Sequence, residues 1–402
     1  MDIILTLAFC VAFVTSLIVT ALALRVAPRI GFVDRPGGRK VHERAVPFGG
    51  GVAIVLATCL VVGAAAAGAA LSARAPGLLP IPPALSEDIT RAAARVPLLL
   101  YILGGGLLIA LFGLWDDIRP RSPAAKFTAQ FLVAVVVVAA SGLRISLNPF
   151  LERLHQSEIR DLLQAAVTVL WIVLLTNSFN LLDNMDGLSS TVSFICAGAL
   201  LILAVQTGQF LIAGFLLALM GAILGFLYFN FPPAGIFMGD MGAMFIGYML
   251  ATISVLTTFV NREQFNPLFP VLVPLIIFAV PIYDALSVVA IRMHHRRPIM
   301  KGDRNHFSHR MRRLGMNGRR VLLTIALVTL ATSLGATVPY GPPSWQVVIP
   351  AVQAICVMCV IMQLELVSVQ IECLEPESKQ APARDSSEPR SGEDARPPGP
   401  HH

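Results

Sequence analysis

Long apolar runs with few charged residues recur along most of the chain and constrain its fold more than any other feature. A helix that crosses a bilayer needs ~20 mostly apolar residues, and its backbone polar groups must all be paired within the hydrocarbon. The sequence therefore predicts an all-α, polytopic integral membrane protein with about 11 transmembrane helices. The predicted helices are residues 3–24, 50–72, 97–114, 126–141, 163–179, 187–205, 210–229, 241–260, 268–291, 320–338 and 345–370.

Composition agrees with a surface that faces lipid. Hydrophobic residues make up 55% of the chain and charged residues only 13%, whereas soluble domains are about 25% charged. In a soluble protein the net charge of +6 would direct attention to nucleic acid. In a membrane protein, an excess of Lys and Arg is the ordinary composition of cytoplasmic loops. We therefore expect a lipid bilayer as partner and no nucleic acid.

The loops between the predicted helices fall into two sets with unequal positive charge. The first set is 25–49, 115–125, 180–186, 230–240 and 292–319, and the second is 73–96, 142–162, 206–209, 261–267 and 339–344. With the residues at the helix rims included, the first set holds 19 of the 30 Lys and Arg and the second holds seven. The positive-inside rule then places the first set in the cytoplasm, the N-terminus outside and the C-terminus inside.

The chain divides into one membrane domain and a tail. Residues 1–371 contain all the apolar runs and form the predicted transmembrane domain. Residues 372–402 are rich in Pro, Ser, Glu and Arg. Such a composition cannot bury enough apolar area to fold, so we expect a disordered cytoplasmic tail.

Carboxylates gather where the apolar helices reach the first set of loops. A single Asp before a helix is often a cap that binds free N–H groups, but an adjacent pair such as Asp116–Asp117 cannot be explained by one cap. Carboxylates that converge on one membrane face repel each other unless a cation is present. Hard oxygen ligands favour Mg²⁺, or Mn²⁺ in its place. The sequence thus predicts a metal site among Asp116, Asp117, Asp183, Asp186 and Asp240.

Basic residues, histidines and glycines occur in the same loops. Arginine and lysine there can serve topology alone, but the topology rule does not count histidine. His306 and His309 are three residues apart and would share one face of a helix. The glycines at 49–51 and the G-D-x-G of Gly239–Gly242 allow close backbone approach at helix starts, where phosphate binds, or simply tight turns. The basic residues and histidines of interest are Arg39, Lys40, His42, Arg44, Lys126, Arg304, His306, His309 and Arg310.

Five motifs in these loops together resemble the polyprenyl-phosphate N-acetylhexosamine-1-phosphate transferase family, also called glycosyltransferase family 4. The resemblance covers roughly residues 1–370, in order. The motifs are GFVDRPGGRKVHERAVPFGGG from Gly31, GLWDDIRPRSPAAK ending at Lys126, NSFNLLDNMDGLS from Asn177, GIFMGDMGAMFIG from Gly235 and RRPIMKGDRNHFSHRM from Arg296.

The chain departs from the family's patterns at three positions. Asn184 stands where N-x-x-N-L-x-D-G-x-D-G-L has its first glycine, and Ala243 replaces the serine of F-M-G-D-x-G-S. Ser308 replaces the middle histidine of D-R-x-H-x-H-H-R. The histidine loop is where the family recognises the sugar, so Ser308 bears on sugar identity rather than reaction class. The muramoyl-pentapeptide branch has a different first loop and a denser histidine run, which favours the N-acetylhexosamine branch.

The resemblance implies a reaction and a set of roles. A sugar-1-phosphate would pass from a UDP-sugar, such as UDP-GlcNAc, to polyprenyl (undecaprenyl) phosphate with release of UMP, at the cytoplasmic face of the plasma (inner) membrane. This would be the first membrane step of cell-wall or surface-polysaccharide synthesis, with Mg²⁺ as cofactor. A homodimer is compatible with the family, but no residue demands one. The implied roles are catalytic for Asp116, Asp117, Asp183, Asp186 and His306, metal-binding for Asn180 and Asp240, and substrate-binding for Lys40, His42, Lys126, Asn177, Arg304 and His309.

Two other functions and a second mechanism stay open. A secondary transporter would carry ionisable residues near the bilayer midplane and often repeated halves, whereas here the carboxylates cluster at one interface and no repeat is visible. A catalytically inactive scaffold for glycan assembly could use the tail to recruit partners. Within the transferase reading, direct transfer and a covalent aspartyl intermediate are not separated by the sequence.

Overall fold

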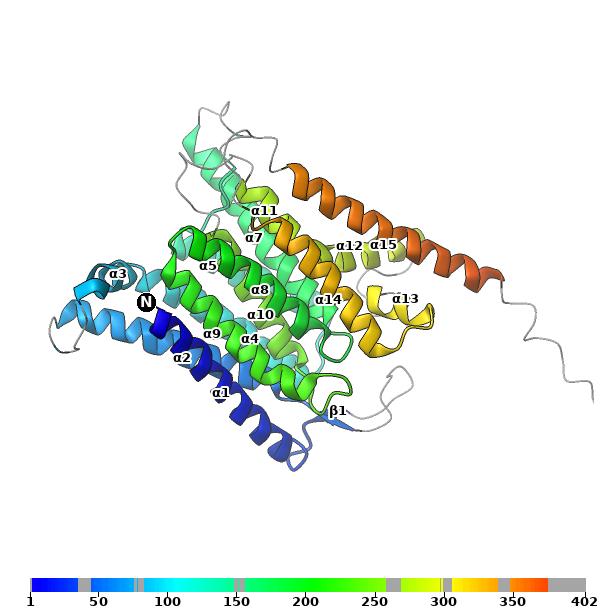
Figure 1. Ribbon diagram of the computed structural model, residues 1–402, viewed down its shortest axis with the longest axis horizontal. Coiled ribbons are helices and arrows are strands. Elements are labelled where there is room, and N and C mark those ends of the chain that lie inside the picture. The colour runs from blue at the N-terminus through cyan, green and yellow to red at the C-terminus, as the bar shows by residue number, and fades with distance from the viewer. Residues whose placement is uncertain are drawn as a thin grey trace, which may run out of the picture.

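The computed structural model describes residues 2–34, 45–75, 78, 83–147, 151, 156–257, 269–296, 298, 306–338 and 348–374, which form a bundle of long helices (Figure 1). One two-stranded hairpin interrupts the helices near the N-terminus. The elements are α1 (Asp2–Val26), β1 (Val33–Asp34), β2 (Val46–Pro47), α2 (Gly50–Arg74), α3 (Pro83–Ala94), α4 (Val96–Ile118), α5 (Pro123–Ser141), α7 (Ser157–Leu182), α8 (Leu188–Gln206), α9 (Phe210–Asn230), α10 (Gly239–Thr257), α11 (Phe269–Ile277), α12 (Ala279–His294), α13 (Phe307–Arg313), α14 (Gly318–Gly335) and α15 (Val348–Leu374).

The predicted all-α membrane fold is confirmed, and the total of about 11 spans stays a prediction. Within the described residues, nine helices are long and apolar enough to cross a membrane, or ten if α11 and α12 count as one bent span. A further apolar helical segment, Val348–Gln363, forms the first part of α15, a helix of 27 residues. The tail beyond residue 374 lies outside the described residues.

The prediction of one continuous helix over residues 268–291 is wrong, because the chain bends by 78° between α11 and α12. Two prolines explain the bend. Pro274 lies inside α11, where its ring disturbs the preceding turn. Pro281 is the third residue of α12, a position whose N–H has no partner within a new helix in any case. A helix therefore starts again at Ala279 instead of continuing.

Two short helices lie in segments that the sequence analysis treated as loops. The first, α3, contains charged residues on a helix that is only partly apolar, so no apolar run indicates it. The second, α13, is seven residues long and begins at Phe307, in the late histidine loop. It lies beside the start of α14 (Figure 1), also contacts α15, and places Phe307 and Met311 in the hydrophobic core.

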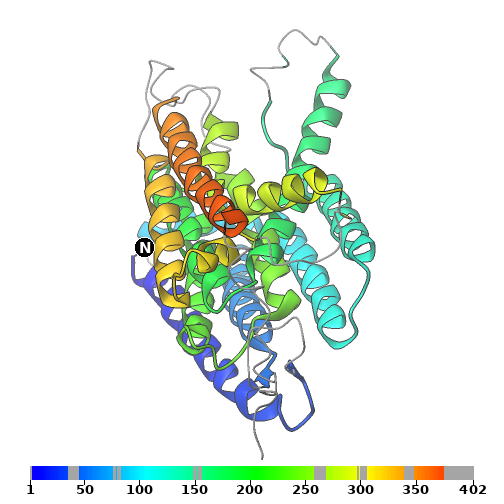
Figure 2. The ribbon, with the colours of Figure 1, turned by 90° about the vertical axis from the view of Figure 1, so that its right-hand side faces the viewer.

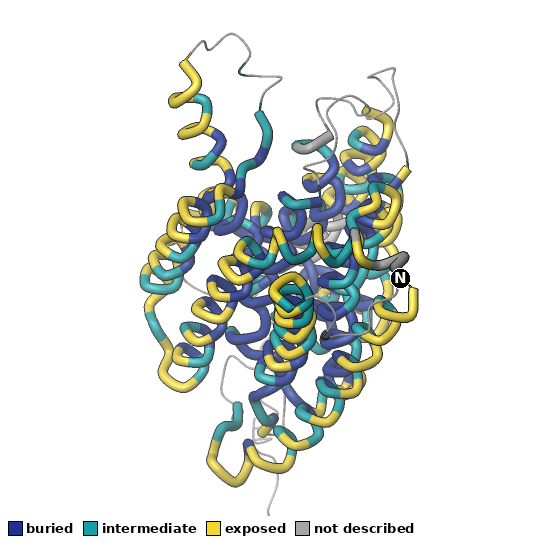
Figure 3. The backbone as a smooth tube through the Cα atoms, turned by 90° about the vertical axis from the view of Figure 1, so that its left-hand side faces the viewer, coloured by how far each residue is buried: buried dark blue, intermediate teal, exposed yellow. Residues whose placement is uncertain are grey.

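Exposed apolar side chains form the outer surface of the bundle. On α1 the exposed residues include Ile3, Leu7, Val14, Ile18 and Leu22, which recur at helical spacing along one face. Figure 3 shows the same division in the other peripheral helices, with exposed backbone outward and buried backbone inward. A soluble monomer rarely exposes so large a contiguous apolar area, so this surface fits a lipid environment.

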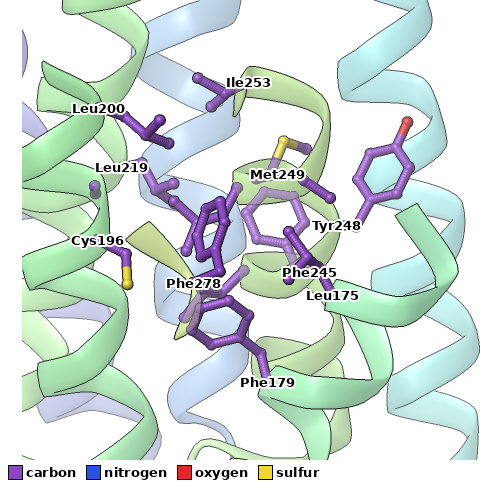
Figure 4. Close-up of a cluster of buried hydrophobic side chains, with 14 of the residues drawn as sticks. Leu175, Phe179, Cys196, Leu200, Leu219, Phe245, Tyr248, Met249, Ile253 and Phe278 are labelled. Carbon is purple, nitrogen blue, oxygen red and sulfur yellow. The ribbon is translucent and has the colours of Figure 1, made fainter. Parts of the chain in front are cut away.

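Helix α10 forms the centre of the bundle. Nearly all of its residues are buried, and it packs against α2, α4, α7 and α8. Figure 4 shows Phe245, Met249 and Ile253 of α10 among side chains from the surrounding helices, with Phe278 from the α11–α12 bend at the cluster's centre. The Phe278 ring meets Phe179 edge-on, with centroids 6.0 Å apart. The start of α10 is thereby held firmly at one end of the bundle.

The hairpin and the α9–α10 connection close that end. Phe48, just after β2, pairs with Phe237 in an isolated bridge. The amides of Gly50 and Gly51 donate to the carbonyls of Phe237 and Met238 at 3.1 and 2.9 Å. These glycine amides therefore pack α2 against α10 and are not free to bind phosphate, so the tight-turn alternative holds for the glycines at 49–51.

Candidate active site

Four helix ends meet at one end of the bundle and carry most of the predicted carboxylates. They are the C-termini of α4 and α7 and the N-termini of α5 and α10. Long apolar helices fix these ends because each helix packs against α10 or its neighbours. Residues that are 60 to 120 positions apart in the sequence thereby come into direct contact.

Lys126 lies between two carboxylates of this group. Its Nζ is 2.7 Å from Asp116 Oδ2 and also binds Asp240 Oδ2. The local sequence explains its position: Ser122 is the N-cap of α5, accepting a hydrogen bond from the Ala125 amide at 3.2 Å, and Pro123 occupies the first turn. The S-P-x-x-K motif thus starts a helix whose first turn points an ammonium group at the carboxylates.

Asp116 and Asp117 in the last turn of α4 have different partners. Asp116 is buried, and besides Lys126 it accepts a hydrogen bond from the Arg121 amide at 2.7 Å. Asp117 accepts hydrogen bonds from the amides of Asp240 at 2.8 Å and Met241 at 3.1 Å. Asp117 therefore caps the N-terminus of a helix 123 residues away in the sequence, where a negative charge also complements the helix dipole.

Gly239 makes that cap possible. Its φ is +74°, in the left-handed region where residues other than glycine are strained. A Cβ added at this position would lie 2.5 Å from Asp117 Oδ2. The glycine of the G-D-x-G motif thus permits both the turn and the approach of the Asp117 carboxylate.

Asp240 is the meeting point of three helices. Its Oδ1 accepts a hydrogen bond from Asn180 Nδ2 of α7 at 3.0 Å, while its Oδ2 binds Lys126 of α5. Asn177, one turn earlier on α7, donates instead to Gln130 of α5 and to the Val173 carbonyl. The structure thus brings Asn180 to the carboxylates and fixes Asn177 against α5; a substrate-binding role for Asn177 stays a prediction.

Asp183 and Asp186 lie in the connection between α7 and α8. Burial raises the pKa of Asp183 to about 8, with further contributions from the negative charges of Asp240, Asp117 and Asp186. Asp183 as a whole residue is half-buried. Asp186 accepts a hydrogen bond from the Ala234 amide at 3.0 Å, which links this connection to the segment before α10.

His306 lies just before α13, and His309 lies within it. His306 is buried and its Nδ1 lies 3.1 Å from Asp284 Oδ2, while the Phe307 amide donates to Asp284 Oδ1 at 2.6 Å. The His309 ring lies next to that of His306, with centroids 6.4 Å apart. An aspartate within α12 therefore both caps α13 and orients the His306 ring.

Comparison with known proteins gives the family. Residues 99–258 match the model of glycosyl transferase family 4. A Bacillus subtilis (strain 168) protein named probable undecaprenyl-phosphate N-acetylglucosaminyl 1-phosphate transferase is 32% identical over 343 residues, which cover 85% of this chain and 86% of that protein. The chain belongs to glycosyl transferase family 4.

More distant members of glycosyl transferase family 4 cover the chain to a similar extent. A decaprenyl-phosphate N-acetylglucosaminephosphotransferase of Mycobacterium tuberculosis (strain ATCC 25618 / H37Rv) is 31% identical over 329 residues, or 77% of this chain and 76% of that protein. The undecaprenyl-phosphate alpha-N-acetylglucosaminyl 1-phosphate transferase of Escherichia coli (strain K12) is 26% identical over 331 residues, or 80% and 81%. The family assignment therefore applies to most of the chain and not to one motif.

Some predicted site residues of this family member cannot be placed, and others were missed. Lys40, His42 and Arg304 lie outside the described residues. Gln130 was not identified from the sequence, and Asp284 only by its match, with Pro281, to the family's P-x-x-D pattern. Asp284 had a signal, since it is an ionisable residue inside an apolar run, and such residues are usually functional or paired. Gln130 had no comparable signal.

The oxygen ligands at the carboxylates fit a magnesium ion in their chemistry. Among the described residues, no three His, Cys, Asp or Glu side chains are grouped closely enough to hold a metal by themselves. Magnesium usually takes one or two protein carboxylates and keeps waters and substrate phosphates for its other positions. A cationic group, the Lys126 ammonium, already binds Asp240 Oδ2, so this carboxylate faces a position that attracts positive charge.

Proposed function

We propose that this protein transfers a sugar-1-phosphate, from an N-acetylhexosamine such as N-acetylglucosamine, from a UDP-sugar to polyprenyl phosphate and releases UMP. The observation that carries the proposal is the contact of Asp240 with Lys126 and Asn180 at the meeting of three helix ends. The relatives named above support it, because each is named for the transfer of N-acetylglucosamine phosphate to undecaprenyl or decaprenyl phosphate.

The reaction joins two anions, and the site supplies the charges to do so. An oxygen of the acceptor phosphate forms a bond to the sugar-side phosphorus of the donor. The bond from that phosphorus to the bridging oxygen breaks, and the bridging oxygen leaves with its electron pair on UMP. The sugar C1–O bond stays intact. Phosphoryl transfer of this kind depends mainly on positioning and on neutralised charge, which Lys126 contributes directly.

The remaining residues of the site either hold another residue in position or orient a substrate. Asp117 caps α10 and so positions Asp240. Its other lone pairs remain available to accept a proton from the acceptor phosphate, which is the role that the family resemblance implies. Asp183 and Asp186 line the approach to the nucleotide or the metal. His306 and His309 lie on the histidine-bearing segment, where they can contact the donor. A covalent intermediate on one aspartate stays the rival mechanism.

Magnesium would be held by Asp240, with the side-chain oxygen of Asn180 after rotation of its amide and with substrate phosphates. The nitrogen and oxygen of such an amide are assigned from its hydrogen bonds, so the same side chain can offer either atom. When bound, the ion would neutralise charge that develops on the donor diphosphate. Manganese has the same preference for oxygen ligands.

The membrane placement suits both substrates. The carboxylates lie at helix ends, where a water-soluble nucleotide can reach them, while the apolar outer surface of the bundle can hold the tail of the lipid acceptor. The excess of Lys and Arg in the loops at this end assigns them to the cytoplasm. We therefore place the active site at the cytoplasmic face of the plasma (inner) membrane, with the N-terminus outside.

The test is transfer of labelled sugar phosphate from a panel of UDP-sugars to undecaprenyl phosphate in detergent, with Mg²⁺ or with a chelator. We expect lipid-linked product and an equal amount of UMP only when metal and lipid are both present. The best donor names the sugar. If purified, folded protein gives no product from any donor, the transferase proposal fails and the scaffold becomes the leading alternative.

A further inference from the structure

Two of the positions where this chain departs from its family's motifs are in contact with each other. Asn184 stands in place of a glycine in the α7–α8 connection, and Ser308 stands in place of a histidine in α13. In the structure Ser308 Oγ donates a hydrogen bond to Asn184 Oδ1, across 124 residues of sequence. Ser308 is buried, with 1% of its surface exposed, so water does not readily replace this bond.

The Asn184 side chain is held in the orientation that this contact needs. Its Nδ2 donates to the Leu181 carbonyl at 2.8 Å, in the last turn of α7. The amide oxygen therefore points away from α7 and accepts the serine hydroxyl. Both ends of the amide are used, which assigns the oxygen and the nitrogen without ambiguity.

This bond connects α13 to a different part of the protein than two other side-chain contacts of the segment do. Asp284 binds the His306 ring and the Phe307 amide, and Arg310 Nη2 donates to Ser287 at 2.8 Å. Both of these anchors fasten α13 to α12. The Asn184–Ser308 bond fastens α13 to the connection that carries Asp183 and Asp186, and so sets the distance between the histidines and the carboxylates.

The two departures also compensate each other in size. The family's pattern combines the smallest residue in the connection with a large imidazole in α13. This chain has a larger amide in the connection and a small hydroxyl in α13. Exchanges that conserve total volume are tolerated best in packed sites, whereas a histidine at 308 facing Asn184 would place two large side chains in a space that now holds a single hydrogen bond.

We propose that Asn184 and Ser308 are a matched pair of positioning residues that sets α13, and with it His306 and His309, against the carboxylates of the active site. Neither residue need touch a reacting atom. The readout by activity rests on the proposed function, since it assumes that these histidines face the donor. The pair then tunes how the donor sits relative to the acceptor phosphate.

The main experiment restores the family residues singly and together. We expect Ser308→His alone to lower kcat/KM for the UDP-sugar at least tenfold, because the imidazole displaces Asn184 and moves α13. We expect Asn184→Gly alone to lower it about threefold, by loss of one buried hydrogen bond. The double variant should return to within about threefold of the unmodified protein. Losses that simply multiply in the double variant would overturn the pairing.

The kinetic parameters separate positioning from general damage. Because α13 is the part that moves, the change should appear in KM for the UDP-sugar, with KM for the lipid acceptor within about twofold of its original value. Ser308→Thr keeps the hydroxyl and should retain most activity. Equal changes in both KM values, together with a loss of thermal stability, would reduce the pair to a structural contact.

A second measurement needs no activity. The double variant Asn184→Cys/Ser308→Cys should form a disulfide on mild oxidation of the full chain in detergent, identified by mass spectrometry of the linked peptides. The matched control is Asn184→Cys/His309→Cys, in which the second cysteine starts about 100° further round the helix. If the disulfide forms but no donor reacts, the contact stands and the proposed function fails; if a donor reacts and neither the disulfide nor the kinetic rescue appears, the pair fails.

Discussion

The carboxylate junction and the histidine segment of this protein are built in different ways. The carboxylate junction comprises Asp116, Asp117, Lys126, Asn180 and Asp240, at the ends of the long helices α4, α5, α7 and α10, which pack together in the bundle. The histidine segment is His306 and α13, seven helical residues held to α12 by Asp284 and Ser287 and to the α7–α8 connection by Asn184. The first is fixed by long helices around the core of the bundle, and the second by side-chain bonds together with two buried side chains, Phe307 and Met311, that reach the core.

This difference indicates which part of the site can change in sequence between members of the family. Moving a residue of the carboxylate junction requires moving a long buried helix, whose neighbours are close-packed. The histidine segment is only seven helical residues long, so a side-chain contact such as Asn184–Ser308 can be exchanged there without moving a long helix. Of the three departures, Ser308 lies in the histidine segment and Asn184 contacts it from the α7–α8 connection, while Ala243 lies in α10, three residues after Asp240. The junction residues Asp116, Asp117, Asn180 and Asp240 all match the family pattern. We therefore expect reaction chemistry to depend on the junction and donor choice on the segment.

The largest effect should come from removing the charge at the centre of the junction. Asp240→Asn keeps the shape of the side chain but loses the ion pair with Lys126 and the charge that would attract a metal. We expect kcat to fall about 10²- to 10³-fold, as for the loss of other electrostatic groups at ~3–4 kcal/mol each. The measurement is transfer of labelled sugar phosphate with saturating Mg²⁺.

The matched control for this variant is Asp161→Asn. Asp161 is exposed near the start of α7, about 30 Å along the helix from Asn180 at ~1.5 Å per residue. It should retain activity within about twofold, as expected for a surface change far from the site. Near-full turnover by folded Asp240→Asn protein would remove Asp240 from the mechanism and leave the junction as a structural contact.

The second prediction breaks the link between Asp117 and α10. Gly239→Ala adds a Cβ at φ +74° and 2.5 Å from Asp117 Oδ2. Backbone strain of this kind costs about 1–3 kcal/mol, and the displaced carboxylate would release the start of α10. We expect activity to fall on the order of 100-fold and thermal stability to decrease, both measured on the same detergent-purified protein.

Gly63→Ala is the control for that substitution. Gly63 lies in α2, where a Cβ would meet no atom within 4 Å, and alanine favours a helix more than glycine does. This variant should be unchanged or slightly more stable. If Gly239→Ala behaves in the same way, the close approach of Asp117 to α10 is not needed for function.

The extent to which the sequence predicts this structure follows the same division. Apolar runs predict the long helices, and the alternation of loops places Asp116, Asp183 and Asp240 on one side. The contact of Asp117 with the amides of Asp240 and Met241 is not predictable in that way, because it joins positions 123 residues apart. Local cap patterns describe neighbours in the sequence, not a cap supplied by another helix.

Local detail was missed at three places. The apolar run of the ninth predicted helix continues through Pro274 and Pro281, so hydropathy alone predicts one helix where the chain bends by 78°. The helices α3 and α13 are too short or too polar to be predicted from apolar periodicity. The Asn184–Ser308 contact could be predicted only as two separate departures, since the sequence does not say that they meet.

The third prediction tests how the histidine segment depends on Asp284. Asp284→Ala removes the carboxylate that caps α13 and binds His306, both buried contacts. Loss of a helix cap costs up to about 2 kcal/mol, or roughly 30-fold, and we expect kcat/KM for the UDP-sugar to fall by about this factor. Asp284→Asn keeps an oxygen for the Phe307 amide and should lose less activity than the alanine variant.

The kinetic parameter that changes in the Asp284 variants, and the residues whose hydrogen exchange becomes faster, show how Asp284 acts. If Asp284 acts through α13, KM for the donor changes most, and hydrogen exchange of residues 306–313 becomes faster than in the unmodified protein. Exchange in α10 should stay as slow as before, because the carboxylate junction is held separately. A uniform increase in exchange across the bundle would mean that Asp284 stabilises the whole fold instead of the histidine segment.

The smallest effect concerns the pH dependence of metal binding near Asp183. Burial and the neighbouring carboxylates raise the pKa of Asp183 to about 8, well above the unfolded value of about 3.9. The protonated carboxyl is therefore favoured in the fold: its contribution to stability is complete below about pH 4 and is lost as the pH rises toward 8. A divalent cation beside it reverses this preference, because it favours the ionised form and releases the proton.

The Mg²⁺ concentration for half-maximal activity should consequently fall as pH rises from 6 to 8, and then level off. Release of one proton gives a change of at most tenfold per pH unit, and partial coupling would give about threefold. Asp183→Asn should flatten this dependence, while Asp161→Asn should leave it as in the unmodified protein. A Mg²⁺ requirement that stays constant from pH 6 to 8 in the unmodified protein would show that Asp183 does not exchange its proton for the metal. The junction would then bind its cation through Asp240 without electrostatic help from the α7–α8 connection, and the two regions would be independent in chemistry as well as in packing.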